Sequence, residues 1–242
     1  MKRWLCIAVL LFLVPGSVWA QGAAGVVEKD VVVVLHGLAR TSRSMASIEK
    51  RLVKEGYTVV NVDYPSTDHP IEYLADTVLD DVLQACCRDA TLHFVTHSMG
   101  GILVRYYLKD HRLPNLGRVV MLSPPNQGSE LVDVFKDNFI FKKVNGPAGA
   151  QMGTGPESLP LQLGPVTFDL GVVMGNQSLN PIFSKMIPGP DDGKVSVARA
   201  QVEGMRDFLV MPHSHTFIMR KRRVIDQVVY YLRHGAFERS GG

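Results

Sequence analysis

The segment Val95-Thr96-His97-Ser98-Met99-Gly100-Gly101 decides the fold, because it ends one apolar run and opens another. A serine in a tight turn between a strand and a helix forms a nucleophile elbow. Residues two before and two after this serine must be small for strand and helix to approach, and Gly100 meets that requirement. Thr96 departs from the usual glycine at the earlier position. The segment predicts a strand, a strained turn that presents Ser98, and a helix.

Strand and helix signals alternate on both sides of this segment. The β-branched run Val31–Leu35 is typical of a strand buried on both faces of a parallel sheet. Further strands are predicted at Tyr57–Val62, Leu92–Thr96, Val119–Leu122, Leu170–Met174 and Phe208–Met211. Helices are predicted at about Ser44–Glu55, Ile71–Cys87, Gly101–Lys109 and Val224–Arg233, followed by a loose tail at Phe237–Gly242. Repeated units of this kind predict the α/β class, with a doubly wound and mostly parallel sheet.

Regular patterns break off between about residues 135 and 164. That stretch is rich in glycine and proline, and it carries the apolar patch Phe139-Ile140-Phe141. A long irregular insertion inside a compact domain is commonly functional or mobile. We therefore expect a short lid or cap beside the site, and an ordinary surface excursion packed on the sheet is the alternative.

The first twenty residues have the three parts of a secretory signal peptide. A positively charged start precedes an apolar run over residues 4–14, and small residues suit cleavage after Ala20. The run is shorter than the roughly 20 apolar residues that span a bilayer. We expect residues 1–20 to be a signal peptide and residues 21–242 to form the exported domain, which would be periplasmic or extracellular.

Composition excludes several classes of protein. Lysine and arginine number 26 against 23 acidic residues, and this near balance argues against a nucleic-acid binder. Three cysteines are too few for a disulfide scaffold. The adjacent Cys86 and Cys87 bridge each other only with strain, so we expect one to pack as a small apolar residue, with a redox role as the alternative. The basic run at 220–223 is expected to be solvated, with weak peripheral contact to an anionic membrane as a second hypothesis.

Four motifs carry a resemblance to a known family. They are Leu35-His36-Gly37-Leu38, Thr96-His97-Ser98-Met99-Gly100, Gly128-Ser129 and Asp192-Gly193-Lys194-Val195. In these motifs the chain resembles the α/β-hydrolase superfamily, in particular its bacterial lipase and esterase branch, from about Val31 to Gly235. Some members of that branch carry alanine or threonine where this chain has Thr96.

The resemblance implies roles for the first two motifs. Ser98 would be the nucleophile, and the alternative is a serine that only caps a helix. The backbone N–H groups of Leu38 and Met99 would form the oxyanion hole. His36 would hold its loop in place, and His97 would support the turn.

The same family order places an acid and then a base after the serine. Asp192 is the expected acid with Asp191 as runner-up, whereas Asp169 lies at a poor position and is expected to be solvated. His215 is the expected base with His213 as runner-up. Zinc binding by these two histidines is the rival interpretation, but no third ligand follows at a suitable spacing. The remaining histidines are expected at the surface or at strand edges, and they are His69, His93, His111 and His234.

The combined prediction is a secreted serine hydrolase that cleaves carboxylic esters, of lipid or acyl type, through Ser98, His215 and Asp192. The reaction would pass through an acyl-enzyme and would need no metal or organic cofactor. An acyltransferase with the same residues is the main alternative, because the acyl group can pass to an alcohol instead of water. A hydrolase fold used only for binding is the alternative from a different class. The preferred chain length is left open.

Overall fold

The computed structural model describes residues 30–85 and 90–239. The predicted signal peptide at 1–20 lies outside the described residues, as do Cys86 and Cys87. Within the described ranges, no helix has the length and apolar character needed to cross a bilayer.

A single six-stranded parallel sheet forms the centre of the molecule, in the order β2-β1-β3-β4-β5-β6. Its strands are β1 (Val31–Leu35), β2 (Thr58–Val62), β3 (Leu92–His97), β4 (Leu116–Leu122), β5 (Leu170–Gly175) and β6 (Asp207–Met211). Every residue of β1, β3 and β5 is buried, which explains why these strands contain few polar residues and no charged one of Asp, Glu, Lys or Arg. The predicted α/β class with a doubly wound parallel sheet is confirmed.

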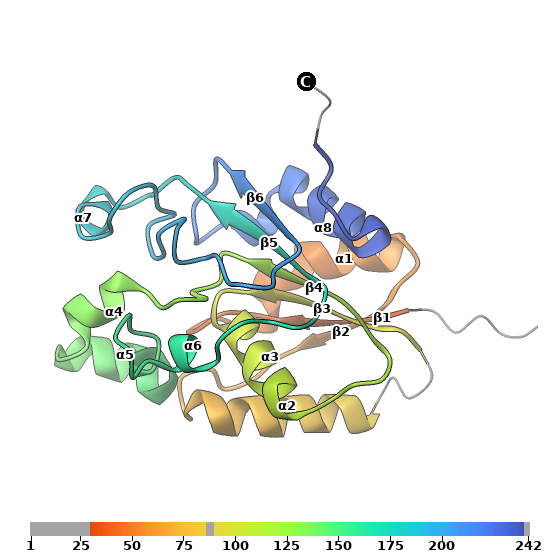
Figure 1. Cartoon of the computed structure of the whole chain (residues 1–242), viewed down its shortest axis with the longest axis horizontal. Coiled ribbons are helices and arrows are strands. Elements are labelled where there is room, and N and C mark those ends of the chain that lie inside the picture. Colours follow the sequence, from red (N-terminus) through yellow and green to blue (C-terminus); the bar gives the residue numbers. More distant parts are fainter. Residues whose placement is uncertain (1–29, 86–89, 240–242) are drawn as a thin grey trace, which may run out of the picture.

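Helices cover both faces of the sheet (Figure 1). One face packs against the short 3-10 helix η1 (Ser42–Met45), α1 (Ala46–Lys54) and α8 (Arg222–His234), and its core includes Ile48, Leu52 and Val228. The other face packs against α2 (Ile71–Ala85) and α3 (Met99–Asp110), with Leu74 and Ile102 in a second core. Two apolar layers therefore hold the sheet rigid between them.

The register of the sheet brings the ends of neighbouring strands together. Leu35 at the end of β1 pairs with Val62 of β2 and with Thr96 of β3. Gly175 at the end of β5 pairs with Met211 of β6. The loops after β1, β3, β5 and β6 consequently leave from one edge of the sheet, at the left of Figure 1, and these loops carry the predicted site residues.

The region expected to be irregular between residues 135 and 164 is largely helical, so that expectation is wrong. It contains α5 (Phe139–Ala150) and α6 (Leu159–Gln162), preceded by α4 (Glu130–Phe135). The side chain of Asn138 caps α5 by accepting from the N–H of Phe141. The glycine and proline that obscured this helix lie at a kink, where Gly146 has φ 61° and ψ −168° and precedes Pro147. These helices lie over the edge of the sheet where the site loops leave (Figure 1).

The chain after α8 also differs from the expected loose tail. Gly235 ends the helix in a left-handed conformation with φ 71°, as helix-terminating glycines commonly do. Phe237 is buried, its ring lies 4.8 Å from that of Tyr231, and its N–H donates to Asp207. The segment is therefore anchored at least to this point.

Two further polar residues are more engaged than expected. His93 is buried within β3, and its Nδ1 accepts from the N–H of Arg118. Asp169 accepts from the hydroxyl of Tyr231 and forms ion pairs with Arg118 and Arg206. Both residues stabilise the edge of the sheet where the strands begin, away from the predicted site.

Candidate active site

Ser98 occupies a strained turn between β3 and α3. Its backbone has φ 53° and ψ −124°, a region that residues other than glycine rarely adopt. The turn is held because the N–H of Ser98 donates to the carbonyl of Leu122 in the neighbouring strand. A Cβ at Gly100 would lie 2.8 Å from the carbonyl oxygen of His36, so only glycine lets α3 approach β1 here. This strain aims the Ser98 side chain away from the sheet.

Thr96 fits in place of the usual glycine because another glycine makes room for it. A Cβ at Gly101 would lie 3.2 Å from Oγ1 of Thr96 and 2.9 Å from Sδ of Met121. The Thr96 hydroxyl is buried and has no hydrogen-bond partner among the described residues. The threonine therefore fills space between β3 and α3 rather than binding anything.

Three of the predicted site residues form one hydrogen-bonded chain. His215 Nε2 lies 3.0 Å from the Ser98 hydroxyl, and His215 Nδ1 lies 2.8 Å from Asp192 Oδ2. The other carboxylate oxygen of Asp192 accepts from the N–H groups of Lys194 and Val195, at 3.0 and 2.9 Å. All three side chains are buried. With its Nδ1 proton directed at the carboxylate, His215 presents the Nε2 lone pair to Ser98, which is the arrangement that a base needs.

The runner-up residues lie outside this chain of hydrogen bonds. Asp191 Oδ1 accepts from the N–H of Gly193 and from the hydroxyl of Ser184, at 2.7 and 2.9 Å, so it shapes the loop of its neighbour. The Nε2 of His213 is buried and finds no partner within the described part of the chain. The structure thus places Asp192 and His215 beside Ser98, and Asp191 and His213 elsewhere.

The loop after β1 is held by a contact that the sequence did not reveal. The His36 ring stacks on Tyr64 with 4.1 Å between centroids, and the Tyr64 hydroxyl donates to the carbonyl of His36 at 2.5 Å. Nδ1–H of His36 donates to the carbonyl of Gly37 at 2.8 Å, while Nε2 accepts from the N–H of Tyr64. Burial lowers the pKa of His36, which keeps the ring neutral in this role. The loop that carries Leu38, an expected oxyanion donor together with Met99, is thereby fixed.

His97 supports His215 rather than only the turn. Its Nε2 lies 3.0 Å from the carbonyl oxygen of His215, and the two rings lie 4.9 Å apart. Since a carbonyl only accepts, Nε2 of His97 carries the proton. Burial, reinforced by the nearby charges of His215 and Arg40, lowers the pKa of His97 well below its usual range. A neutral His97 therefore positions the backbone of the candidate base.

A cavity of about 450 Å³ opens beside Ser98 and His215. Its apolar wall comes from α4, α5, the start of α7 (Pro181–Ser184) and nearby loops. The apolar lining residues are Leu38, Ala39, Pro125, Leu131, Val132, Phe135, Phe141, Val144, Met152, Phe183 and Val195. Four of these lining residues, Phe135, Phe141, Val144 and Met152, belong to the region in which the sequence predicted no regular structure.

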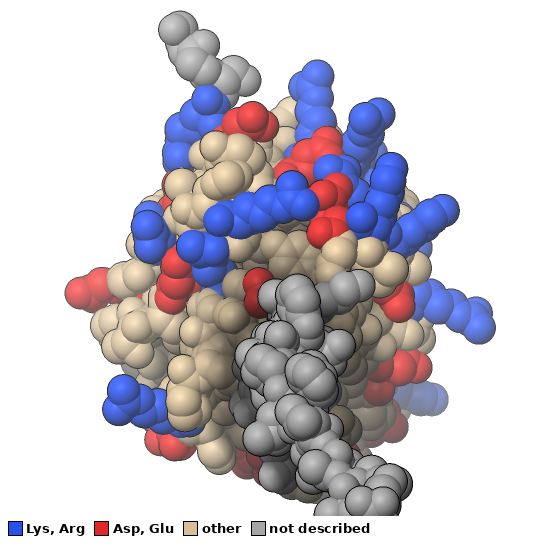
Figure 2. Space-filling view, turned by 90° about the vertical axis from the view of Figure 1, so that its right-hand side faces the viewer, with Lys and Arg blue, Asp and Glu red and all other residues tan. Residues whose placement is uncertain are grey.

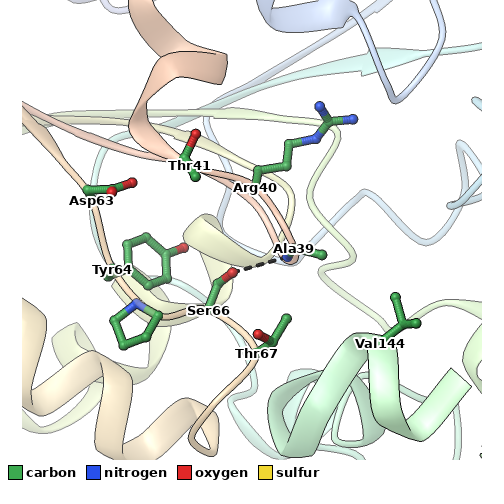
Figure 3. A pocket seen from close by; sticks show the side chains of 9 residues that line it. Ala39, Arg40, Thr41, Asp63, Tyr64, Ser66, Thr67 and Val144 are labelled. Carbon is green, nitrogen blue, oxygen red and sulfur yellow. Dashed lines mark hydrogen bonds between the residues drawn. The ribbon is translucent and has the colours of Figure 1, made fainter. Parts of the chain in front are cut away.

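A second, more open groove of about 550 Å³ adjoins this cavity, and the two share Ala39, Arg40 and Val144 (Figure 3). Ala39 has φ 53°, and its N–H donates to the Ser66 hydroxyl at 3.0 Å. The kink of α5 touches the groove wall, because a Cβ at Gly146 would lie only 1.7 Å from the carbonyl oxygen of Thr67. Apolar and polar binding space therefore meet next to the loop after β1.

The loop that carries Asp192 is hydrogen-bonded to residues at the start of α4. The Ser129 hydroxyl donates to the carbonyl of Lys194 at 2.7 Å, and Glu130 accepts from Ser196 and Arg199. Gly128-Ser129 is one of the four motifs that carry the family resemblance, and this contact gives the motif a physical role. A Cβ at Gly128 would lie 1.9 Å from the carbonyl oxygen of Gly153, so glycine is required there.

The strand order, the strained serine after β3 and the histidine and acid after β6 and β5 define the α/β-hydrolase class of protein. Residues 32–229 match the family model described as "Alpha/beta hydrolase family". The chain belongs to this family. At the level of sequence, no match was found among the curated proteins.

Solved structures share the fold at low sequence identity. The mature form of lipase BlEst2 from Bacillus licheniformis is 20% identical with a TM-score of 0.67, over 84% of this chain and 92% of that one. Phospholipase PlaB from Legionella pneumophila is 17% identical with a TM-score of 0.63, over 86% of this chain and 59% of that one. YbtT, a type II thioesterase from a yersiniabactin biosynthetic pathway, is 14% identical with a TM-score of 0.58, over 87% and 95%. These structures share the fold of this chain. Membership in the α/β-hydrolase family supports the conclusion that the protein is a hydrolase.

Proposed function

We propose that the protein hydrolyses carboxylic esters of acyl chains, with Ser98 as nucleophile, His215 as base and Asp192 as acid. The observation that carries the proposal is the hydrogen-bonded chain from Ser98 through His215 to Asp192, at 3.0 and 2.8 Å. The left-handed backbone of Ser98 supports it, because strain at this position is expected where a nucleophile is presented to a substrate.

In the first half of the reaction, Ser98 Oγ attacks the ester carbonyl carbon and its proton moves to His215 Nε2. Negative charge develops on the carbonyl oxygen, and this oxygen accepts hydrogen bonds from the N–H groups of Leu38 and Met99. Each such donor lowers the barrier by roughly 3 kcal/mol. Asp192 stabilises the charged His215, which then gives its proton to the departing alcohol, and the acyl group remains on Ser98.

In the second half, water takes the place of the alcohol. His215 removes a proton from the water, whose oxygen attacks the acyl carbon, and the bond to Ser98 breaks as the serine regains its proton. The acid product then leaves. An alcohol that entered in place of water would give acyl transfer instead, so the nature of the acceptor separates the two activities.

The cavity beside Ser98 supports an acyl chain as the carboxylic part of the substrate. Its walls are mainly apolar, and further apolar side chains lie exposed near them. Phe139 and Ile140 of α5 are 76% and 68% exposed, next to the lining residue Phe141, and Ile182 of α7 is 64% exposed beside Phe183. Apolar surface of this kind beside a binding cavity favours a lipid over a small polar ester.

A fluorophosphonate probe and a chain-length series of p-nitrophenyl esters test the proposal. Wild-type protein should be labelled at Ser98 and hydrolyse the esters, while Ser98→Ala should lose labelling and nearly all turnover with an unchanged melting temperature. Equal hydrolysis by wild type and Ser98→Ala would contradict the proposal. Esters are compared below and above their micellar threshold, and an added alcohol acceptor reveals acyl transfer as a new ester product.

Export and weak membrane contact are part of the proposal and rest on the sequence. The leader pattern at 1–20 supports export, and the exposed basic run at 220–223 supports contact with an anionic lipid surface. Expression of the full chain in a bacterial host, followed by fractionation and N-terminal sequencing, should give exported protein that begins at Gln21. Recovery of only uncleaved protein in the cytosol would contradict export. Sedimentation with anionic but not zwitterionic vesicles would support membrane contact.

A further inference from the structure

Two cationic side chains lie in the wall of the cavity beside the candidate nucleophile. Arg40 follows the loop that carries Leu38, and Lys194 follows Asp192, whose carboxylate accepts its backbone N–H. Both cations line the same cavity as Ser98. A substrate bound at Ser98 would therefore share this cavity with two positive charges.

Neither of these cations forms an ion pair with a residue that the structure describes. Among the ion pairs within 4.0 Å that join residues of 30–85 and 90–239, none includes Arg40 or Lys194. Asp63 is the only carboxylate among the described residues that line the adjoining groove, and it accepts from the N–H of Ser42. In Figure 3 the Arg40 side chain extends away from Asp63.

Some cations elsewhere on the protein are paired with acidic side chains. Figure 2 views the molecule from the side opposite the site, and there lysine and arginine gather with acidic side chains among them. Arg51 pairs with Glu55 and Asp226, and Arg233 pairs with Glu55. Most lysines and arginines among the described residues nevertheless form no ion pair within 4.0 Å. What sets Arg40 and Lys194 apart is that they line the cavity beside Ser98.

The two unpaired cations also disfavour each other. Partial burial, together with the charge of Arg220, lowers the pKa of Arg40. Partial burial and the charge of Arg40 lower the pKa of Lys194. The side chain of Arg40 is half-buried and that of Lys194 is more exposed, and the charge of Asp192 partly offsets the effect of Arg40 on Lys194. A bound anion would relieve the remaining repulsion between the two positive charges. An anionic ligand group would therefore be stabilised where it could reach both side chains.

Building on the proposed ester hydrolysis, we propose that the alcohol part of the substrate carries a phosphate group, which Arg40 and Lys194 bind. The apolar wall of the cavity would take the acyl chain. The phosphate would lie where the cavity meets the groove of Figure 3, because Arg40 lines both spaces and Lys194 lines the cavity, and the rest of the alcohol would extend into the groove. That groove offers hydroxyl groups from Thr41, Ser66 and Thr67 beside Arg40, a mixture that suits a polar phosphorylated alcohol. The substrate class is then an acyl ester of a phosphorylated alcohol such as glycerol phosphate.

A matched pair of soluble substrates tests this assignment. Short-chain 1-acylglycerol 3-phosphate and 1-acylglycerol differ only in the phosphate, and both are used below their micellar thresholds. Wild-type kcat/KM should favour the phosphorylated ester by about tenfold or more, the effect of one to two charge-assisted hydrogen bonds. Arg40→Gln and Lys194→Gln should each reduce this ratio severalfold. The control Lys142→Gln changes an exposed lysine of α5 that does not line the cavity, and the ratio should be unchanged.

Direct binding separates this inference from the proposed function. Calorimetry with Ser98→Ala should detect glycerol 3-phosphate but not glycerol, and the added change Arg40→Gln should abolish the binding. If esters are hydrolysed and Ser98 is labelled, but the ratio is near one and no glycerol 3-phosphate binds, the phosphate site is wrong and the proposed function stands. If glycerol 3-phosphate binds but neither ester is cleaved, the hydrolysis is wrong and the site stands.

A third arm identifies the source of the phosphate. Phosphatidic acid in vesicles is compared with the soluble ester at equal accessible concentration. A preference for the vesicle that Arg40→Gln removes points to a lipid headgroup, and a preference for the soluble ester that Arg40→Gln removes points to a free phosphorylated ester. A preference that survives Arg40→Gln in both arms overturns the assignment.

Discussion

Gly101 leaves open the space that the Thr96 side chain fills, since a Cβ at 101 would lie 3.2 Å from Oγ1 of Thr96. The two residues lie on opposite sides of Ser98, one in β3 and the other in α3. A threonine at this position of the turn is tolerated because a second glycine follows Gly100. Thr96, in place of the usual glycine, and Gly101, which makes room for it, therefore act as a pair.

This pairing makes Gly101→Ala a sensitive change. The new methyl group would also press on Sδ of Met121, 2.9 Å away, so we expect a loss of about 1–3 kcal/mol in the free energy of unfolding. Thr96→Ala removes a buried hydroxyl without a partner in the described structure and should cost no more than about 1 kcal/mol. Urea unfolding of both single variants and the double variant measures the coupling. Strict additivity of the two costs would contradict the pairing.

Asp192 and Asp191 are adjacent, but substitutions of the two should differ sharply in their effect on kcat. Asp192→Asn removes the acceptor of the His215 Nδ1 proton, so we expect kcat to fall by about 10⁴-fold. Asp191→Asn alters hydrogen bonds to Gly193 and Ser184 and should cost less than about tenfold, because it touches no group that changes charge in the reaction. Steady-state kinetics on one soluble ester compares the two. Similar losses of kcat in both variants would contradict the assignment of Asp192, and not Asp191, as the acid.

His97 should act on turnover through His215. Loss of the hydrogen bond to the His215 carbonyl in His97→Ala leaves the base less well positioned, and we expect kcat to fall at least about tenfold with KM little changed. His97→Gln retains a donor and should recover part of this loss. His213→Ala serves as the control for removing a nearby imidazole. A fall in stability without any change in kcat would show that His97 is only structural.

Arg105 should contribute to stability from within the core. It is buried in α3 and donates to the carbonyls of Asn126, Pro160 and Gly164, and burial lowers its pKa to about 10. Arg105→Met leaves these carbonyls unpaired and should cost roughly 2–4 kcal/mol. Chemical denaturation measures the loss, and Lys109→Met, at an exposed position of the same helix, is the control. Equal stability of the two variants would contradict this role.

Acid should destabilise the fold between about pH 6.5 and pH 5.5, before most carboxylates titrate. Burial lowers the pKa values of His36, His93 and His97, so the unfolded chain takes up protons that the folded protein does not. Stability is complete above the unfolded pKa and falls as pH decreases, by at most about 1.4 kcal/mol per pH unit for each histidine. Urea midpoints measured across this range should fall, and His97→Gln should reduce the slope. Urea midpoints that do not change with pH would show that these rings take up protons in the folded protein as readily as in the unfolded chain.

The sheet could be predicted from the sequence because its strands are buried on both faces. In β1 burial goes with an unbroken apolar, mostly β-branched run, and short runs of this kind are typical of strands in the middle of a parallel sheet. β3 is equally buried but includes His93 and His97 among its apolar residues. The strained turn at Ser98 could be anticipated for a similar reason, since close packing restricts the residues around it. The assignment of catalytic roles to Ser98, Asp192 and His215 stays a prediction that the experiments above test.

Other features depend on partners far away in the sequence. Helix α5 was missed because Gly146 and Pro147 signal a break, and only the contact with Thr67 shows that the break is a kink within helical structure. The stacking of Tyr64 on His36 likewise joins two loops, and neither loop has a local pattern that predicts it. Tertiary contacts of this kind leave no periodicity for sequence analysis to detect.

The contact between Gly146 and Thr67 has a consequence for how selectivity can change. The kink of α5 at Gly146 directly follows Val144 and Asn145, which line the cavity beside Ser98, and Thr67 lines the polar groove. Because the two backbones touch, a shift of either wall displaces the other. Mutants selected only for longer acyl chains by moving α5 would therefore also acquire an altered tolerance for the alcohol. Directed evolution of the two preferences would proceed along one shared path, unless the kink itself is rebuilt.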